Sequence, residues 1–217
     1  MLIILGGLPG TGKTTIAREL ARQLGAVHVR IDSIEEAILD SGVLSSPIND
    51  AGYRVGNAVA ADNLRIGRTV IADSVNPIPL SRDAWVEVAN RAQVSVVEIE
   101  VTCSDTKEHQ HRVETRISDF PRSRSLTWQD VVSRDYRPWD RERIVIDTAN
   151  RTVEQVLKIL RGAISKRKSA PPFSELRKTP LVIWNVAVCQ ALEPRNRVKR
   201  TPPPKFASVP PSATTDR

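Results

Sequence analysis

The sequence has little cysteine, few aromatic residues and no long hydrophobic run. Its two cysteines, Cys103 and Cys189, lack metal-ligand spacing, which favours a reducing cytoplasm over a disulfide-rich secreted class. Aromatic residues make up 4% of the chain, too few for a surface that stacks single-stranded nucleic acid. The longest apolar stretch, residues 181–192, is interrupted by polar side chains and is shorter than the roughly 20 residues of a membrane span. We therefore expect a cytoplasmic protein with no membrane helix, and no signal peptide either, because the first apolar run leads straight into a glycine-rich loop.

Excess positive charge is confined to the C-terminal end of the chain. The formal net charge is +7, but residues 165–217 hold 11 Lys and Arg against 3 Asp and Glu. Subtraction from the totals of 32 and 25 leaves 21 against 22 in residues 1–164. Nine of the 15 prolines also lie in 165–217. We predict a near-neutral domain over 1–164 that does not bind nucleic acid, and a basic, Pro-rich, mostly disordered tail over 165–217 that is available for polyanion contact.

Strand-like and helix-like patterns alternate along residues 1–164. Short β-branched or apolar runs predict strands at Leu2–Leu5, Val27–Ile31, Thr69–Asp73, Val94–Val101 and Arg143–Ile146. Apolar residues at helical spacing predict helices at Thr14–Leu24, Ser33–Leu39, Asn49–Leu64, Ser81–Arg91, Asp105–Ile117 and Thr152–Ile164. This alternation predicts an α/β fold with a parallel sheet covered on both faces.

The strongest motif is a glycine-rich loop between the first strand and the first helix. It has the form Gly7-x-x-x-x-Gly12-Lys13-Thr14, in the strand–loop–helix context that a phosphate-binding loop requires. Glycines let successive amides turn toward phosphates, Lys13 reaches the β and γ oxygens, and the Thr14 hydroxyl can hold magnesium. We predict binding of ATP with Mg²⁺ by Gly10, Thr11, Gly12, Lys13, Thr14 and Thr15. The alternative is a glycine-rich turn that binds nothing.

With Arg30-Ile31-Asp32 following the second strand, residues 1 to about 162 resemble the small P-loop kinases that phosphorylate hydroxyls. Relatives by pattern include zeta toxins, chloramphenicol phosphotransferase, gluconate kinase and the kinase domain of polynucleotide kinase. The resemblance implies a P-loop NTPase three-layer sandwich with a five-stranded parallel sheet of order 2-3-1-4-5, an arginine lid, and an acceptor site at the carboxyl ends of the strands.

Asp32 lies just past the second strand, at the sheet edge where open α/β folds place their ligands. The matching aspartate of such kinases accepts the proton of the acceptor hydroxyl, so the resemblance makes Asp32 the candidate base. The alternative is that Asp32 or Ser33 caps the following helix. Several relatives carry an arginine three residues after this aspartate. Glu35 stands there in this chain, which argues against a phosphorylated or nucleotide acceptor and favours a neutral or cationic one.

Asp73 ends the third predicted strand and resembles the acidic strand end that relatives use for magnesium and acceptor. By the same resemblance Asn76 and Arg82 are candidates for lining the acceptor pocket. Each also has a local alternative, because Asn76 precedes a proline, as turn residues do, and Arg82 fits a solvated helix face.

Arg112 and Arg116 lie one helical turn apart on the helix after the fourth strand. The family's lid helix bears arginines here, and arginine neutralises charge that develops on a transferring phosphoryl group. The alternative is a solvated face whose arginines pair with neighbouring glutamates. His109 and His111 are two residues apart, so on a helix they point in different directions and do not form a metal pair.

Residues 118–140 show no apolar periodicity, apart from a short helix that we predict at 125–133. A long irregular insert in a compact domain is more often functional than accidental. It carries four arginines, of which Arg122 and Arg124 are weaker lid candidates. Near its end, Trp139 resembles a family segment that packs near the adenine, although core packing explains it equally well.

These observations predict an ATP-dependent phosphotransferase that moves the γ-phosphoryl group to a hydroxyl of a small molecule. In this prediction Lys13, Asp32, Arg112 and Arg116 are catalytic, Asp32, Asp73, Asn76 and Arg82 contact the acceptor, and Thr14 and Asp73 hold the metal. The alternatives are an ATPase or switch that acts through a partner bound by the tail, a zeta-type toxin, and a polynucleotide-end kinase.

Overall fold

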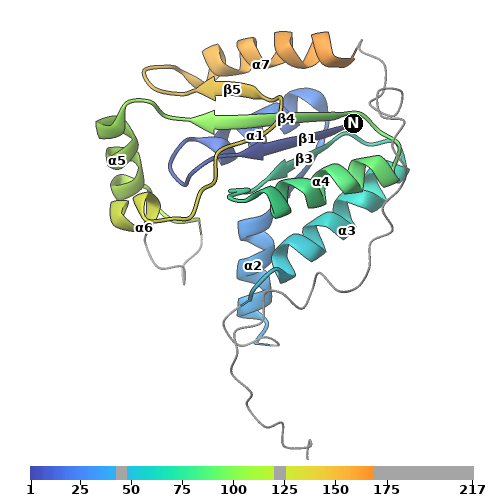
Figure 1. The fold of residues 1–217 in the computed structure, drawn as a ribbon, viewed down its shortest axis with the longest axis horizontal. Coiled ribbons are helices and arrows are strands. Elements are labelled where there is room, and N and C mark those ends of the chain that lie inside the picture. Colours follow the sequence, from blue (N-terminus) through green and yellow to red (C-terminus); the bar gives the residue numbers. More distant parts are fainter. Residues whose placement is uncertain (43–47, 120–125, 169–217) are drawn as a thin grey trace, which may run out of the picture. The chain divides into compact units, whose positions relative to one another are not determined.

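The computed structural model describes residues 1–42, 48–119 and 126–168. Within them five parallel strands form one sheet, with helices on both faces (Figure 1). The strands are β1 (Leu2–Gly6), β2 (Val27–Arg30), β3 (Val70–Asp73), β4 (Val96–Thr102) and β5 (Ile144–Asp147). Their order is β2-β3-β1-β4-β5, which confirms the predicted fold class.

Seven helices connect or follow the strands within the described residues. They are α1 (Lys13–Leu24), α2 (Ile31–Asp40), α3 (Ala51–Arg65), α4 (Pro79–Arg91), α5 (Thr106–Thr115), α6 (Trp128–Val132) and α7 (Val153–Lys168). None of the helices in this part of the chain is long and apolar enough to cross a membrane. The last helix extends four residues past the predicted end of the domain at residue 164, and the division at that position stays a prediction.

Two hydrophobic cores fix the sheet between its helix layers. On one face Ile16 and Leu20 of α1 and Leu160 of α7 pack against the sheet. On the other face Leu64 of α3 and Trp85 of α4 do so. Every residue of the central strand β1 is buried, because helices cover the sheet on both sides.

The candidate site lies at the carboxyl end of the sheet. The carboxyl ends of all five strands meet there because the strands are parallel, and α5 and α6 lie beyond the arrowhead of β4 (Figure 1). The loop after β1 and the start of α2 after β2 belong to this end of the sheet.

Candidate functional site

The loop after β1 has the backbone of a phosphate-binding loop. Gly7, Gly10 and Gly12 have φ angles of 140°, 84° and 90°, which side-chain-bearing residues rarely adopt. A Cβ at Gly7 would lie 2.1 Å from the carbonyl oxygen of Val101 on β4. Both the conformation and the close approach therefore require glycine.

Lys13 is the first residue of α1, and its side chain is 7% exposed. Its Nζ donates to the carbonyl oxygen of Leu8 at 2.8 Å. Burial lowers the pKa of Lys13 to about 8, although the charges of Asp73 and Asp32 act in the opposite direction. The ammonium is thus largely desolvated beneath the loop, where an anionic ligand would stabilise its charge.

Helix α5 supports the loop from outside the sheet. His109 Nε2 lies 2.8 Å from the carbonyl oxygen of Pro9, and a Cβ at Gly10 would lie 2.5 Å from Val113. His109 also packs edge-on against Trp128 of α6, with ring centroids 5.0 Å apart. His109 is buried while His111 is exposed, as their two-residue spacing predicts. Among the described residues no cluster of three or more His, Cys, Asp or Glu side chains could hold a metal.

A cavity of about 650 Å³ opens over the loop and the start of α2. Most of the predicted site residues line it: Gly10, Gly12, Lys13, Thr14, Thr15, Asp32, Asp73, Arg112 and Arg116. Thr11 does not. Its hydroxyl donates to the carbonyl oxygen of Leu8 at 2.9 Å, and its own carbonyl oxygen lies 3.0 Å from Thr148 Oγ1. The side chain of Thr11 therefore braces the loop from within.

Asp32 lies in the first turn of α2, half exposed to the cavity. The helix begins at Ile31, directly after β2, and its N-cap, Arg30, makes no side-chain capping bond. The prediction that Asp32 or Ser33 caps this helix is therefore wrong, because both residues already lie inside it. Arg30 Nη2 lies 3.9 Å from Asp32 Oδ2.

Asp73 ends β3 beside Lys13, and its side chain is 2% exposed. His28 Nε2 lies 3.1 Å from Asp73 Oδ2. Asp73 and Thr14 both line the cavity. A carboxylate and a hydroxyl are the few protein ligands that magnesium takes when phosphates and water complete its shell, so this donor set fits the ion.

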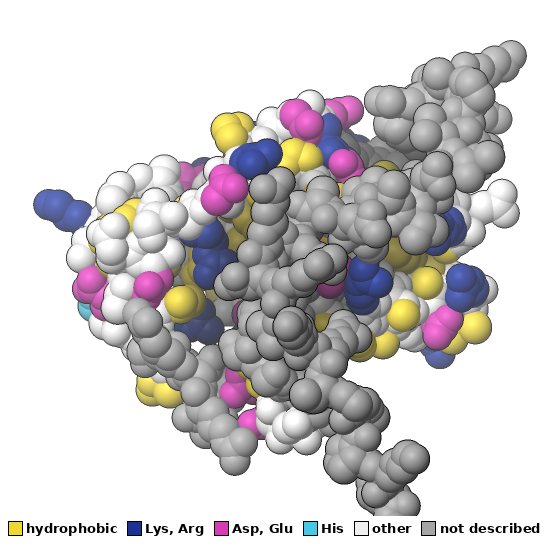
Figure 2. All heavy atoms as spheres, turned by 60° about the horizontal axis from the view of Figure 1, so that its bottom comes forward, with side chains coloured by type: hydrophobic (Ala, Val, Ile, Leu, Met, Phe, Trp, Pro, Cys, Tyr) yellow, Lys and Arg dark blue, Asp and Glu magenta, His cyan; other side chains and the backbone are white. Residues whose placement is uncertain are grey.

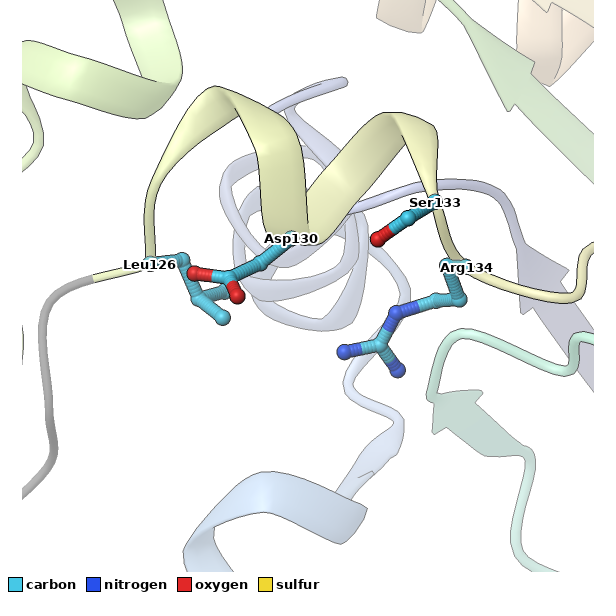
Figure 3. A pocket seen from close by; sticks show the side chains of 4 residues that line it. All are labelled: Leu126, Asp130, Ser133 and Arg134. Atoms are coloured by element: carbon cyan, nitrogen blue, oxygen red, sulfur yellow. The ribbon is translucent and has the colours of Figure 1, made fainter.

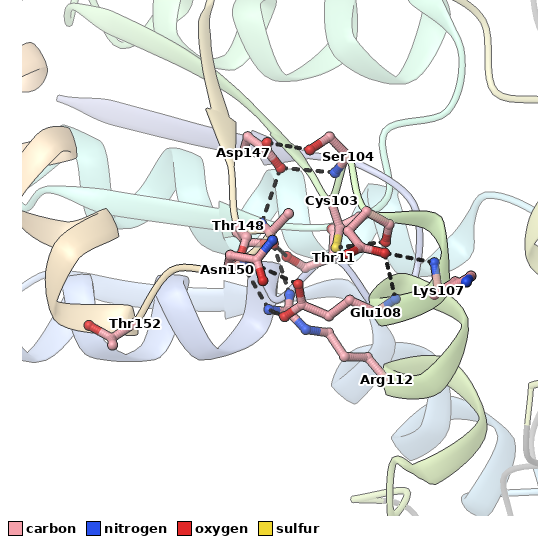
Figure 4. A network of polar contacts seen from close by, with 12 residues as sticks. Thr11, Cys103, Ser104, Lys107, Glu108, Arg112, Asp147, Thr148, Asn150 and Thr152 are labelled. Atoms are coloured by element: carbon pink, nitrogen blue, oxygen red, sulfur yellow. Dashed lines mark hydrogen bonds and ion pairs between the residues drawn. The ribbon is translucent and has the colours of Figure 1, made fainter.

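Arg112 is held in a polar network at the rim of the cavity (Figure 4). Its guanidinium donates to Glu108 Oε1 at 2.5 Å and to Thr148 Oγ1 at 2.9 Å. The Thr148 hydroxyl also lies 3.0 Å from the carbonyl oxygens of both Thr11 and Thr102. The Glu108 contact is the pairing that the solvated-face alternative describes. Arg116 is exposed and lies just after α5, at its C-cap.

The predictions for Asn76 and Arg82 as pocket residues are wrong. Arg82 is fully buried and donates to the carbonyl oxygens of Asn76, Pro77, Arg137 and Pro138. Asn76 is also fully buried, and its amide donates to the carbonyl oxygen of Leu5 at 2.9 Å. Neither lines the cavity. Both fix the backbone of the connections behind the site.

Trp139 likewise has a packing role. It is 7% exposed, lies outside the residues that line the cavity, and stacks on the Arg82 guanidinium at 4.3 Å. A Cβ at Gly6 would lie 2.6 Å from its ring. Of the insert, residues 120–125, which include Arg122 and Arg124, lie outside the described residues.

Sequence reasoning missed several charged residues that line the cavity, among them Arg18, Arg30, Asp119 and Arg134. Asp119 accepts from Arg30 Nη1 at 2.5 Å and lies 3.5 Å from Arg18 Nη2, and the bond from Arg30 lowers the pKa of Asp119. Arg134 extends from the end of α6 into a second hollow of about 400 Å³ (Figure 3). Arg18 could have been predicted from the sequence, because it lies four residues after Thr14 and so on the same face of the first helix.

The loop, the sheet order and the cavity define a P-loop nucleotide-binding α/β protein. The chain belongs to the AAA domain family, whose model matches residues 2–134. Its structural neighbours include kinases, as the predicted resemblance to small P-loop kinases requires.

A curated relative is an uncharacterized protein of Mycobacterium tuberculosis, 32% identical over 117 residues that cover 48% of this chain. The chain spans only 23% of that relative's length.

Three solved structures share the fold and cover 76% of this chain. The APS kinase of Mycobacterium tuberculosis in complex with AMPPNP and APS has a TM-score of 0.58, with 16% identity and 96% of that chain covered. The gluconokinase of Sinorhizobium meliloti has a TM-score of 0.52, with 18% identity and 93% covered. Kti12 of Chaetomium thermophilum in complex with ADP-AlF3 has a TM-score of 0.53, with 25% identity and 99% covered.

Proposed function

We propose that this protein is an ATP-dependent phosphotransferase that moves the γ-phosphoryl group to a hydroxyl of a small molecule. The observation that carries the proposal is that Lys13, at the phosphate loop after β1, and Asp32, in the first turn of α2 after β2, line one cavity. A cavity of about 650 Å³ has room for a triphosphate with a small acceptor beside it. The kinases among the structural neighbours and the nucleotide analogues in two of those complexes support it.

In this proposal the loop amides and Lys13 bind the triphosphate, and Thr14 and Asp73 would hold magnesium. The ion would neutralise charge on the β and γ oxygens. Asp32 accepts the proton of the acceptor hydroxyl as its oxygen attacks the γ phosphorus. The bond from that phosphorus to the bridging β–γ oxygen breaks, and the products are ADP and a phosphate monoester.

Arg112 and Arg116 complete the phosphate end of the cavity. Both line it from the end of α5, where a guanidinium can fork onto phosphate oxygens. Arg112 is preorganised by Glu108 and Thr148, so little side-chain entropy is lost when it engages a phosphate. Arg116 is the mobile partner of the pair in this proposal, because it follows the last helical residue of α5.

The test is transfer of label from γ-labelled ATP to a panel of small hydroxyl compounds. We expect Lys13→Ala to abolish transfer and Asp32→Asn to lower it by about 10²-fold or more while ATP affinity is retained. Asp62→Asn is the matched control, because Asp62 is an exposed carboxylate on α3 that pairs with the exposed Arg65 one turn further along the helix. Transfer that survives Asp32→Asn unchanged overturns the assignment of the base.

Three outcomes would point to the other functions. Lys13-dependent ATP hydrolysis that no acceptor stimulates, with a partner lost on removal of residues 165–217, supports a switch. Label on nucleic-acid ends supports an end kinase. Growth arrest on expression that Lys13→Ala relieves supports a toxin.

A further inference from the structure

One face of α2 gives the acceptor end of the cavity its charge. Glu35 and Glu36 lie three and four residues after Asp32, and Leu39 lies four and three residues after them, which places all four on one side of the helix. All four line the cavity. Three carboxylates therefore lie along the wall that begins at the candidate base.

The side chain of Glu35 packs closely against Gly52 of α3. A Cβ at Gly52 of α3 would lie 2.4 Å from Glu35 Cγ and 2.8 Å from Oε1. Gly52 does not have a positive φ, so glycine is needed here for space and not for backbone conformation. The side chain of Glu35 thus packs directly on the backbone of α3, which limits the directions its carboxyl can take.

The charge of Glu35 is poorly compensated by the described residues. Burial raises its pKa to about 7, and the neighbouring Asp32 acts in the same direction. Arg134 is the described cation that opposes them, and the charge of Glu35 adds to the burial that raises the pKa of Tyr53 on α3. Arg30 also lines the cavity, where it pairs with Asp119 at 2.5 Å and lies 3.9 Å from Asp32.

Cations also line the cavity. Lys13 belongs to the phosphate loop, Arg112 and Arg116 come from the end of α5, and Arg18 and Arg151 line the same cavity. Figure 2 shows Lys and Arg side chains interspersed with Asp and Glu side chains on the face that it presents. The cavity therefore offers cations around the phosphate loop, while the described face of α2 adds only carboxylates and Leu39, with Arg30 and Arg134 as the cations near them.

We infer that the acceptor is an amino alcohol, in which a protonated amine bound by Glu35 lies about one helical turn, ~5 Å, from the hydroxyl that Asp32 activates. This inference rests on the proposed function and assigns Glu35 as the residue that determines specificity. The amine keeps its proton throughout, and only the hydroxyl proton moves, to Asp32. Leu39 and Ile48 offer apolar contact to the carbon skeleton between or beside the two groups.

The test compares acceptors that differ only in exchange of a hydroxyl for an amine. Suitable pairs are 1,3-propanediol with 3-amino-1-propanol, 1,4-butanediol with 4-amino-1-butanol, and glucose with 2-amino-2-deoxyglucose. ADP release with MgATP gives kcat/KM, and calorimetry with AMPPNP gives binding. We expect kcat/KM of at least one amine to exceed that of its neutral partner by roughly tenfold or more.

Glu35→Gln keeps the shape of the side chain and removes its charge. We expect it to raise KM for the amine by about tenfold, to change kcat little, and to leave the neutral partner within about twofold. Gly52→Ala, which displaces Glu35, should reproduce the amine-specific loss. Glu87→Gln is the matched control, because Glu87 pairs with Arg91 on the outer side of α4.

The inference is overturned if neutral or anionic acceptors are phosphorylated while every amine fails, or if Glu35→Gln affects both members of a pair alike. It is also overturned if no amine binds or reacts at about 10 mM, a concentration that detects even weak complexes. The proposed function fails separately, when no acceptor of any charge gains the label.

Discussion

Lys13 Nζ donates a hydrogen bond to the carbonyl oxygen of Leu8 at 2.8 Å. The ammonium of Lys13 is thus bonded to the backbone of the phosphate loop, and its partner there is a neutral carbonyl. A bound triphosphate would offer a far stronger partner for the ammonium. Nucleotide binding should therefore be linked to the protonation of this side chain.

We predict that ATP affinity falls as pH rises through about 8. The pKa of Lys13 lies at about 8 because burial outweighs the charges of Asp73 and Asp32, with Arg116 and Arg134 also disfavouring the ammonium. A bound triphosphate raises that pKa again, so binding takes up protons between about pH 8 and 10. Calorimetry in buffers of different ionisation enthalpy measures the uptake. Lys13→Met should bind weakly at every pH, and an uptake that survives this change would contradict the assignment.

Gly7→Ala should unfold or collapse the phosphate loop. The added methyl meets the Val101 carbonyl oxygen at 2.1 Å in a backbone conformation unsuited to alanine, so we expect a loss above about 2 kcal/mol. Gly67→Ala is the matched control, because Gly67 also has a positive φ, 80°, but has no atoms within 4 Å of an added Cβ. Gly67→Ala should lower the free energy of unfolding by about 1 kcal/mol, because only the unfavourable backbone conformation contributes. Chemical denaturation of both variants measures the difference, and equal losses would contradict the steric explanation.

Arg82→Ala should lower stability without a direct effect on nucleotide affinity. The change removes the guanidinium from four backbone carbonyls, of which that of Pro77 keeps a further bond, from the Arg137 N–H, and it removes the stack on Trp139, so we expect a loss of about 3 kcal/mol or more. Arg91→Ala, at the exposed last residue of the same helix, should cost less than about 0.5 kcal/mol. Thermal unfolding and ATP titration below the transition separate the two effects. A weaker ATP affinity in a fully folded Arg82→Ala protein would return this residue to the site.

Glu98 should make the protein less stable as pH rises from about 4.5 to 7. Burial on β4 raises the pKa of this carboxyl to about 7, with Asp83 and Asp140 acting in the same direction and Arg141 and Arg82 against it. Between about pH 4.5 and 7 the folded state therefore holds a proton that the unfolded chain has lost. The free energy of unfolding falls as pH rises through this range and levels off above the folded pKa. Glu98→Gln should flatten this part of the stability curve and stabilise the protein by about 1–3 kcal/mol at pH 8. Urea unfolding across this range measures the slope, and an unchanged slope would contradict the prediction.

Patterns within short stretches of sequence predicted most of the fold. The strands and helices fall within a few residues of their predicted bounds, because apolar periodicity and the glycine loop are local signals. The start of α2 was missed because β2 passes into the helix with no turn residue between them. The predicted strand order also placed Lys13 and Asp32 at the same end of the sheet, and both residues line one cavity in the structure.

Residues whose roles depend on distant neighbours could not be predicted. Nothing near Arg82 in the sequence indicates that carbonyls more than 50 residues away, at Arg137 and Pro138, satisfy its guanidinium. The fit of Glu35 against Gly52 likewise depends on how two helices pack. Charge and residue type gave the list of candidates, but only the tertiary contacts separated those that line the cavity from those that hold it in place.

The Thr148 hydroxyl has a consequence for cooperativity. A single oxygen contacts the phosphate loop at Thr11, the end of β4 at Thr102 and the guanidinium of Arg112. Because a hydroxyl has one proton, a movement of any of these groups redistributes its bonds to the others. Ligand binding to the phosphate loop and the position of α5 are then thermodynamically coupled. Reciprocity requires that each changes the equilibrium constant of the other by the same factor.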